Sequence, residues 1–164
     1  MDLYLLRHGI AVEPGTPGFK TDESRALTDE GRRKLRGIAA AMRAMDLHFD
    51  AILTSPLVRA RQTAEIVAAE LKSRDVQVLH ALRPAGTPRA VIEALQPCAG
   101  VPSLLLVGHE PNLSELVTTL ISAKSGSCIV FKKAGLCRLE ADALRPGRAI
   151  LHWLLTPAQM LRMT

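Results

Sequence analysis

Hydrophobic and polar positions along this chain alternate between two patterns, short apolar runs and longer amphipathic stretches. The apolar runs are typical of buried strands, and four of them lie at Leu3–Leu6, Ala51–Thr54, Val76–Leu79 and Ser103–Val107. Ser103–Val107 is the strongest, because a central parallel strand is covered on both faces and is therefore apolar along its length. The four runs predict the strands of one sheet.

Two amphipathic stretches between these strands predict long helices. The first follows Thr28, its predicted N-cap, and reaches Met45, and the acidic residues Asp29 and Glu30 in its first turn complement the helix dipole. The second follows Ser55-Pro56, which has the form of an N-cap with proline at the first helical position. Apolar residues recur at intervals of three and four, so one face of each helix is expected to cover the sheet.

The second half of the chain changes pattern. A short helix is predicted over Pro88–Leu95, with Thr87 as its N-cap, and another helix begins at Pro111. Later strands joined by short turns are predicted at Cys128–Phe131, Leu136–Glu140 and Ala149–Leu155. Because short turns join antiparallel strands, we expect an antiparallel edge on the sheet.

This order of elements predicts an α/β fold. Strands that alternate with helices form a mostly parallel sheet with helices on both faces, so we expect a three-layer α/β/α sandwich with an antiparallel edge. A chain of 164 residues has the length of one domain, and we expect that domain to span residues 1–164.

Composition and charge limit the partners of this domain. Hydrophobic residues make up 48% of the chain and aromatic residues only 3%, so the core must be aliphatic. The net charge of +5 favours anionic partners. Single-stranded nucleic acid stacks on aromatic side chains, which are almost missing here, so we do not expect nucleic-acid binding.

The cysteine spacing indicates whether the chain binds a metal, and the apolar segments and first residues indicate its cellular location. Cys98, Cys128 and Cys137 form no CxxC pair, which fits neither a disulfide framework nor a zinc site. No apolar stretch approaches the roughly 18 residues that span a bilayer, and no basic region precedes the first apolar run, as it would in a signal peptide. We therefore expect a cytoplasmic protein without metal or other cofactor.

Polar residues with useful chemistry follow three of the predicted strands. Arg7-His8-Gly9 follows Leu3–Leu6, Ser55-Pro56 and Arg59 follow the second strand, and Gly108-His109 follows the strongest one. Because the carboxyl ends of parallel strands meet at one edge of a sheet, two histidines and two arginines are expected to gather there. With two helix N-termini beside them, they fit a tetrahedral phosphate, which glycine lets the backbone approach closely.

These side chains suit phosphoryl transfer through the protein itself. One histidine attacks phosphorus and carries the phosphoryl group, arginines hold the equatorial oxygens, and a second histidine stabilises the charge that develops in the transition state.

The chain resembles the histidine phosphatase superfamily, which has a phosphoglycerate mutase-like fold and an RHG signature. The matching segments are, in order, Arg7-His8-Gly9, Arg25–Gly31, Ser55-Pro56, Arg59-Ala60, Gln62-Thr63-Ala64 and Gly108-His109. The resemblance implies that His8 is the phosphorylated nucleophile. It implies further that Arg7, Arg59 and His109 form the phosphate pocket, to which the backbone of Gly9 is adjacent.

Within the superfamily, the chain is similar to the SixA-type phosphohistidine phosphatases. It has no insertion that would cap the substrate, and its segments Leu82–Gly86 and Gly108–Pro111 have the form found in that subfamily. The resemblance places Arg25, just before a Leu-Thr pair, near the pocket. It also implies a phosphorylated protein as partner.

The chain differs from many members of the superfamily in a residue that acts on the leaving group. Many members carry a glutamate, their general acid, just before the segment equivalent to Leu82–Gly86, and this chain has no carboxylate there. A phosphohistidine protonated on its other nitrogen leaves as neutral imidazole and needs no acid, so the departure fits a phosphoramidate substrate. It fits equally a substitute acid, for which the candidates are Glu13, Asp22, Glu23 and His80.

Two alternatives to a phosphohistidine phosphatase are open from the sequence. A small-molecule phosphomonoester phosphatase of the same superfamily would use the same pocket. A non-catalytic module that binds phosphorylated protein could dispense with the nucleophile, so the two retained histidines argue against it. The roles of Arg61, Arg83 and Glu110 are also open.

Overall fold

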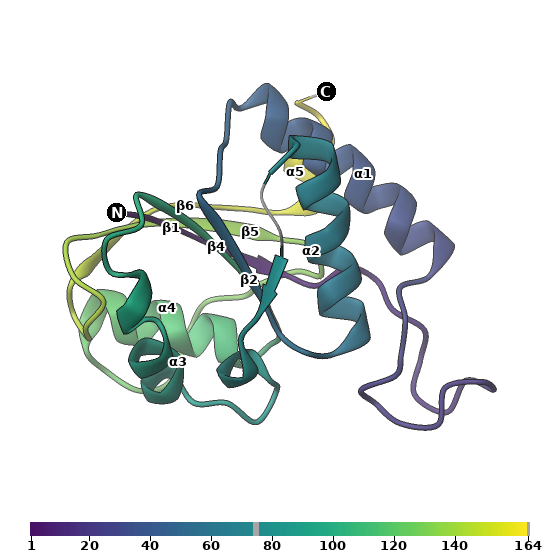
Figure 1. Cartoon of the computed structure of the whole chain (residues 1–164), viewed down its shortest axis with the longest axis horizontal. Helices are drawn as coiled ribbons and strands as arrows, with labels where there is room; N and C mark the ends of the chain where they lie inside the picture. Colours follow the sequence, from purple (N-terminus) through teal and green to yellow (C-terminus); the bar gives the residue numbers. More distant parts are fainter. Residues whose placement is uncertain (74–75, 164) are drawn as a thin grey trace.

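The computed structural model describes residues 1–73 and 76–163, which form a central sheet flanked by helices (Figure 1). In this part of the chain, six strands lie in the order β3-β2-β4-β1-β5-β6. Their bounds are Asp2–Arg7 (β1), Ala51–Thr54 (β2), Val76–Val78 (β3), Ser103–Gly108 (β4), Leu136–Ala141 (β5) and Ala149–Leu155 (β6). Strands β3, β2, β4 and β1 run parallel, whereas β5 and β6 pair antiparallel, so the predicted mostly parallel sheet with an antiparallel edge is confirmed.

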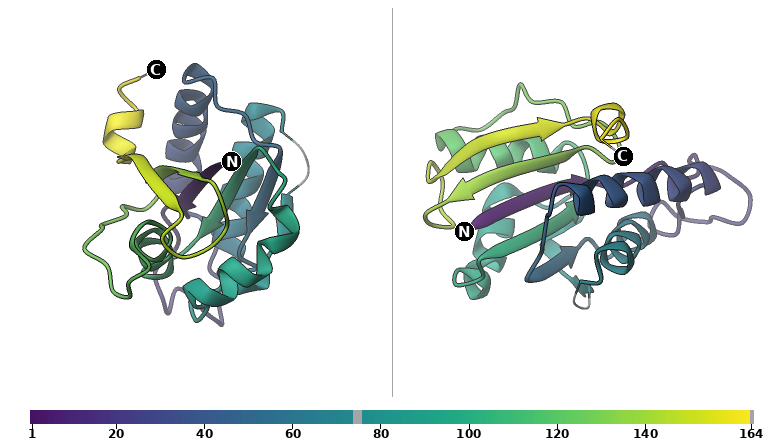
Figure 2. Two further views of the ribbon diagram at one scale, coloured as in Figure 1. Left: turned by 90° about the vertical axis from the view of Figure 1, so that its left-hand side faces the viewer. Right: turned by 90° about the horizontal axis from the view of Figure 1, so that it is seen from above.

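Helices cover both faces of this sheet, as the two views of Figure 2 show. Their bounds are Asp29–Ala44 (α1), Val58–Leu71 (α2), Pro88–Ala94 (α3), Asn112–Ser122 (α4) and Pro157–Met160 (α5), with single 3-10 turns at His80–Leu82 (η1) and Gln96–Cys98 (η2). Helices α1, α2 and α5 share one apolar core, and α3 and α4 share the other. The predicted three-layer arrangement is therefore confirmed.

Successive residues of β1 belong to opposite cores. Leu3 and Leu5 pack on the side of α3 and α4, whereas Tyr4 and Leu6 pack on the side of α1 and α2. All four side chains are at most 5% exposed. Side chains alternate between the faces of a strand, so a strand between two helix layers must be apolar at every position.

Two predicted helix caps are present in the structure. The Thr28 hydroxyl accepts a hydrogen bond of 3.0 Å from the backbone N–H of Gly31. The Thr87 hydroxyl accepts one of 3.2 Å from Ala90. Each hydroxyl satisfies a backbone donor that the first turn of a helix leaves without an intrahelical partner.

The predicted start of the second helix is wrong by two residues. Helix α2 begins at Val58, and Leu57, not Ser55, occupies the N-cap position. The Ser55 hydroxyl instead accepts a 3.3 Å hydrogen bond from the N–H of Leu57 and contacts His109. The Ser-Pro pair therefore forms the turn that leads into the helix, and the serine has a partner far away in the sequence.

The strand predicted at Cys128–Phe131 is also wrong, because this segment has no partner strand. Val130 is 68% exposed, whereas Phe131 is almost completely buried and packs in the core beside α3 and α4. The segment is a loop with one buried side chain, Phe131, and its apolar residues resemble the pattern of a strand.

In the part of the chain that the structure describes, no helix has both the length and the apolar character needed to cross a membrane. Nor do three or more His, Cys, Asp or Glu side chains of these residues lie close enough together to hold a metal ion.

Candidate active site

The carboxyl ends of β1, β2 and β4 meet at one edge of the sheet because these strands are parallel neighbours. Arg7 at the end of β1 lies opposite Gly108 of β4, and Thr54 at the end of β2 lies opposite Val107. An open pocket of about 700 Å³ lies at this edge, and we call it the histidine pocket. The predicted site residues that line it are Arg7, His8, Arg25, Arg59 and His109.

Two contacts fix the tautomer of His8, which is only 7% exposed. Its Nδ1 lies 2.8 Å from the carbonyl oxygen of Gly9, and its Nε2 lies 3.2 Å from Nε of Arg59. A carbonyl oxygen can only accept a hydrogen bond and a guanidinium can only donate one. Both contacts therefore place the proton on Nδ1 and leave a lone pair on Nε2.

The ring of His109 lies beside that of His8, with 5.0 Å between the centroids and 57° between the planes. Its Nε2 is 2.8 Å from the hydroxyl oxygen of Ser55. That hydroxyl accepts from the N–H of Leu57 and carries one proton of its own, which it can donate to Nε2 of His109. In this arrangement, Nδ1 of His109 carries a proton.

Two buried donors of the pocket have no hydrogen-bond partner among the described residues, Nε of Arg7 and Nδ1 of His109. Arg7 also donates from Nη1 to the carbonyl of Phe131 at 2.7 Å, which fixes the position of its guanidinium. An unsatisfied buried donor costs about 1–3 kcal/mol. An anion in the pocket would accept hydrogen bonds from both groups.

A carboxylate bridges the other two arginines of the pocket. Asp22 accepts from Nη2 of Arg59 at 2.9 Å through one oxygen, and from Nε and Nη2 of Arg25 at 2.9 and 2.6 Å through the other. Its backbone carbonyl accepts from Nη1 of Arg59 at 2.7 Å. Arg25 further donates to the carbonyl of Val12 at 2.7 Å. Asp22 thus holds a negative charge where phosphate oxygens would meet these guanidinium groups.

The electrostatics of the pocket keep both imidazoles neutral. Burial lowers the pKa of His8 to about 3, and nearby His109, Arg59 and Arg7 act in the same direction, against the Gly9 carbonyl. Burial also lowers the pKa of His109 to about 3, with Arg59 as the next cause. The Asp22 carboxyl has a lowered pKa, because hydrogen bonds and charges of its two arginines outweigh the opposing effect of burial. A neutral His8 near pH 7 has its lone pair ready for attack.

Gly9 has a packing role next to the pocket. Its N–H donates to the hydroxyl of Thr63 at 3.1 Å, and that hydroxyl donates to the carbonyl of Arg59 at 2.7 Å. A Cβ at this position would lie 2.6 Å from Cδ1 of Leu35 in α1. Glycine therefore lets the turn after β1 pack closely against α1 and α2.

The candidate acids fall into two groups. Glu13 and Asp22 line the histidine pocket, and so does Glu110, whose carboxylate accepts from the N–H of Ser114 at 3.1 Å in the first turn of α4. Glu23 and His80 are not among the residues that line it.

The loop after η1 reaches the pocket through Pro84. Asn112 holds this loop, because its side-chain amide donates to the carbonyls of Arg83 at 2.8 Å and Gly86 at 2.6 Å. The side chains of Arg83 and Arg61 are exposed and do not line the pocket.

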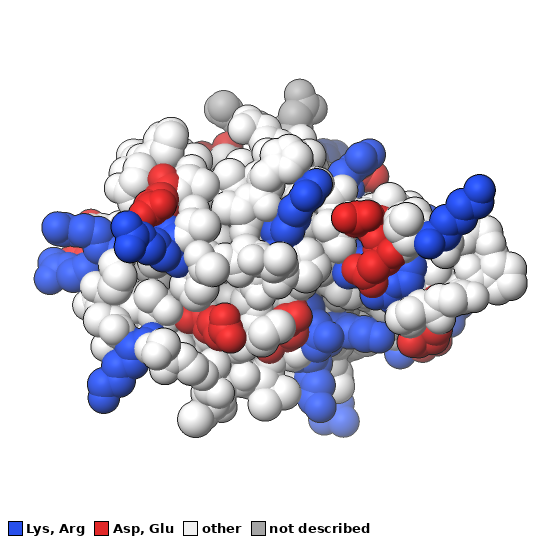
Figure 3. Space-filling model, turned by 90° about the horizontal axis from the view of Figure 1, so that it is seen from below, with Lys and Arg blue, Asp and Glu red and all other residues white. Residues whose placement is uncertain are grey.

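The roles of three residues of the site were not predicted from the sequence. Ser55 has the appearance of a helix cap, Asn112 that of an ordinary first-turn residue, and Lys133 lines the pocket from the loop before β5. The pair of lysines at 132 and 133 was a visible signal, since such a pair suits an anion. On the face shown in Figure 3, basic groups are separated by acidic ones, so this face has no continuous basic stripe.

Comparisons with known proteins agree with this geometry. The family model of the histidine phosphatase superfamily (branch 1) matches residues 3–85. An uncharacterized protein of Picosynechococcus is 39% identical over 88% of both chains. The phosphohistidine phosphatase SixA of Escherichia coli is 27% identical over 98% of this chain and 96% of its own.

Solved structures extend the likeness to the fold. A structure of the protein histidine phosphatase SixA complexed with tungstate matches with a TM-score of 0.85 and 27% identity, over 96% of this chain and 98% of that one. The alpha-ribazole phosphatase of Shigella flexneri matches with a TM-score of 0.74 over 96% of this chain and 97% of its own, and at 19% identity it shows the fold alone.

Proposed function

This chain belongs to the histidine phosphatase superfamily and is a phosphatase, and from that premise we propose that it hydrolyses protein phosphohistidine through a covalent intermediate on Nε2 of His8. The observation that carries the proposal is the state of His8: a buried, neutral imidazole whose lone pair lies at the pocket, beside two buried donors without partners. These groups match the needs of a nucleophile and of a phosphate that it attacks.

In the first step, Nε2 of His8 forms a bond to phosphorus as the bond to the substrate nitrogen breaks. Nε of Arg7 and Nδ1 of His109 donate to the non-bridging oxygens, and Arg59 adds positive charge. The Gly9 carbonyl accepts from Nδ1 of His8 and stabilises the charge that develops on the ring. The substrate imidazole, protonated on its other nitrogen, leaves as a neutral molecule.

In the second step, water attacks the phosphorus of phosphorylated His8. The bond to Nε2 breaks, its electron pair returns to the imidazole, and a proton of the water passes to the departing phosphate or to solvent. Every group in this sequence comes from the chain, the substrate and water, so the proposal requires no metal or cofactor.

The carboxylates of the pocket are the groups that could donate a proton to the leaving group. Asp22 is held ionised by its two arginines, which makes it a poor proton donor. A phosphohistidine substrate needs none, which favours it over a phosphomonoester. Glu13 favours the second candidate, a small-molecule phosphomonoester phosphatase, because this carboxylate lines the pocket and is exposed to an entering alcohol group.

Transient labelling tests the intermediate. A phosphohistidine peptide with a radioactive phosphoryl group should leave an acid-labile label on the wild-type protein in a rapid quench. His8→Ala should lose the label and His48→Ala, at an exposed position outside the pocket, should keep it. Wild-type labelling of His8→Ala would contradict the proposal.

A side-by-side assay tests the substrate class. The value of kcat/KM for the phosphohistidine peptide should exceed that for glycerol phosphate, an alkyl phosphomonoester whose leaving alcohol needs a proton, and Glu13→Gln should leave the former unchanged. If Glu13→Gln removes activity on the phosphomonoester and the wild-type protein prefers that substrate, the second candidate function holds.

A further inference from the structure

A second hollow lies next to the histidine pocket, and we call it the lysine groove. It is an open space of about 740 Å³ between α1, the loop before β5 and the start of α5. The residues that define it are Ile10, Lys34, Ile38, Lys132, Lys133 and Pro157. Four segments, including the chain after β1, thus build one concave surface.

The groove is apolar at its base and positively charged along its sides. Ile38 is fully buried, whereas Lys34, Lys132 and Lys133 are exposed. Among the described residues, no Asp or Glu lines it. Of the three lysines, only Lys34 forms an ion pair within the described part of the chain, a 2.6 Å contact with Glu30 that is half exposed. The groove therefore has an excess of positive charge over an apolar base.

The lysine groove continues into the histidine pocket, because Arg7 and Lys133 line both. Gly9, which lines the groove, also directly follows His8. An extended chain advances about 3.3 Å per residue, so a protein segment with its phosphorylated side chain at His8 reaches the groove within a few residues.

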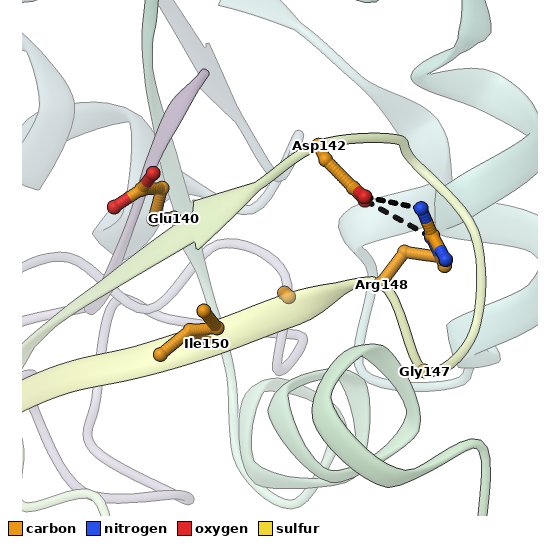
Figure 4. Close-up of a pocket in the computed structure, with 6 residues that line it drawn as sticks. Glu140, Asp142, Gly147, Arg148 and Ile150 are labelled. Carbon is orange, nitrogen blue, oxygen red and sulfur yellow. Dashed lines mark hydrogen bonds and ion pairs between the residues drawn. The ribbon is translucent and has the colours of Figure 1, made fainter.

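Another hollow on the molecule has a different character. At the β5–β6 turn, Asp142 and Arg148 line a pocket together with Glu140 (Figure 4). Arg148 is paired with Asp142, and Glu140 contacts His152 at 2.9 Å. Its charges are thus matched within the chain, whereas Lys132 and Lys133 of the lysine groove form no ion pair with the described residues.

We propose that the lysine groove binds the segment of a phosphorylated protein that flanks the phosphorylated residue, and that it selects segments with carboxylates around an apolar side chain. The proposal rests on the proposed function, since it assumes a protein substrate. Carboxylates complement the exposed lysines, and the apolar side chain covers Ile10 and Pro157, which are partly exposed in the groove. Exposed charge pairs contribute modestly to affinity and strongly to partner choice.

A pair of peptides tests this proposal. Each carries a stable phosphonate analogue of phosphohistidine, flanked in one by Asp, Glu and Leu and in the other by Asn, Gln and Leu. Fluorescence anisotropy at low salt should show roughly tenfold tighter binding of the acidic peptide to the wild-type protein, and the difference should shrink at high salt.

Variants of the groove lysines test whether the groove causes the preference for the acidic peptide. In Lys34→Gln/Lys132→Gln the two peptides should bind almost equally, while hydrolysis of p-nitrophenyl phosphate is unchanged, because neither lysine lines the histidine pocket. Arg36→Gln is the matched control: this exposed residue of α1 lies outside the groove, two positions from Lys34 and therefore on another side of the helix.

Turnover of the corresponding phosphohistidine peptides separates this proposal from the proposed function. Equal binding of both peptides by the wild-type protein, or an unchanged preference in the double variant, overturns the groove proposal even if phosphohistidine is hydrolysed. If the wild-type protein prefers the acidic peptide and the double variant does not, the groove proposal is supported. If neither peptide is hydrolysed, the proposed function is overturned, but this binding result still supports the groove.

Discussion

The two imidazoles of the pocket turn different ring nitrogens towards the place of an anion. In each ring, one hydrogen-bonding neighbour determines which nitrogen carries the proton. The Gly9 carbonyl holds the proton of His8 on Nδ1, which leaves Nε2 free for attack. The Ser55 hydroxyl can donate to Nε2 of His109, which leaves Nδ1 as a donor. Two identical side chains 5.0 Å apart therefore suit opposite roles, nucleophile and anion donor.

Asp22 lies where it competes with an anion for two arginines of the pocket. Its carboxylate occupies hydrogen bonds of Arg25 and Arg59 that phosphate oxygens would otherwise use. In Asp22→Asn the competing charge is gone, so we expect the inhibition constant of inorganic phosphate to fall about twofold to fivefold, a modest change because this side chain is half exposed. Inhibition of p-nitrophenyl phosphate hydrolysis measures it.

Asp142→Asn is the control for this prediction, since it removes an exposed carboxylate that pairs with an arginine far from the pocket. Its inhibition constant should equal that of the wild-type protein. If Asp22→Asn binds phosphate more weakly, the carboxylate holds Arg59 in place and does not compete with the anion.

At the scale of elements, the site depends on how closely α1 approaches the chain after β1. Gly31, in the first turn of α1, is the point of closest contact: a Cβ there would lie 2.2 Å from the backbone oxygen of Ile10. Gly37 lies in the same helix, but a Cβ there would meet only the end of the Leu161 side chain at 2.7 Å.

These two glycines make a matched pair for a stability measurement. Gly31→Ala forces backbone apart, and we expect it to lower the free energy of unfolding by roughly 2 kcal/mol or more. Gly37→Ala displaces a flexible side chain and gains helix propensity, so it should change stability by less than about 1 kcal/mol. Urea denaturation gives both values, and equal losses would show that the close contact with Ile10 does not limit the position of α1.

For the whole molecule, burial of the two imidazoles makes stability depend on pH. Their pKa is about 3 in the folded protein, against an ordinary value of 6.5 in the unfolded chain. Between these values the unfolded chain binds more protons, so the free energy of unfolding falls as the pH decreases from about 6.5 towards 3. Each histidine contributes a slope of at most about 1.4 kcal/mol per pH unit.

Urea denaturation at a series of pH values measures this slope. In His8→Gln one of the two groups is gone, so the unfolding free energy should fall less steeply than in the wild-type protein over the same pH range. Parallel curves for the two proteins would mean that His8 is protonated in the folded state.

Local patterns were sufficient for most of the fold. Continuous apolar runs and amphipathic stretches with a period near 3.6 marked the elements, since burial on one or both faces leaves its pattern in neighbouring residues. The segment Cys128–Phe131 is one exception, where one buried phenylalanine in a loop produced the pattern of a strand. A strand also requires a partner, and pairing is not a local property.

The sequence by itself determined which residues lie at the carboxyl ends of β1, β2 and β4, because a parallel sheet brings such ends to one edge. Only the tertiary structure decided what each side chain does there: Ser55 contacts His109, Asp22 bridges two arginines, and Lys34 and Lys132 meet across one groove. The physical reason is that these contacts join segments far apart in the sequence, and packing of the whole chain sets their distances.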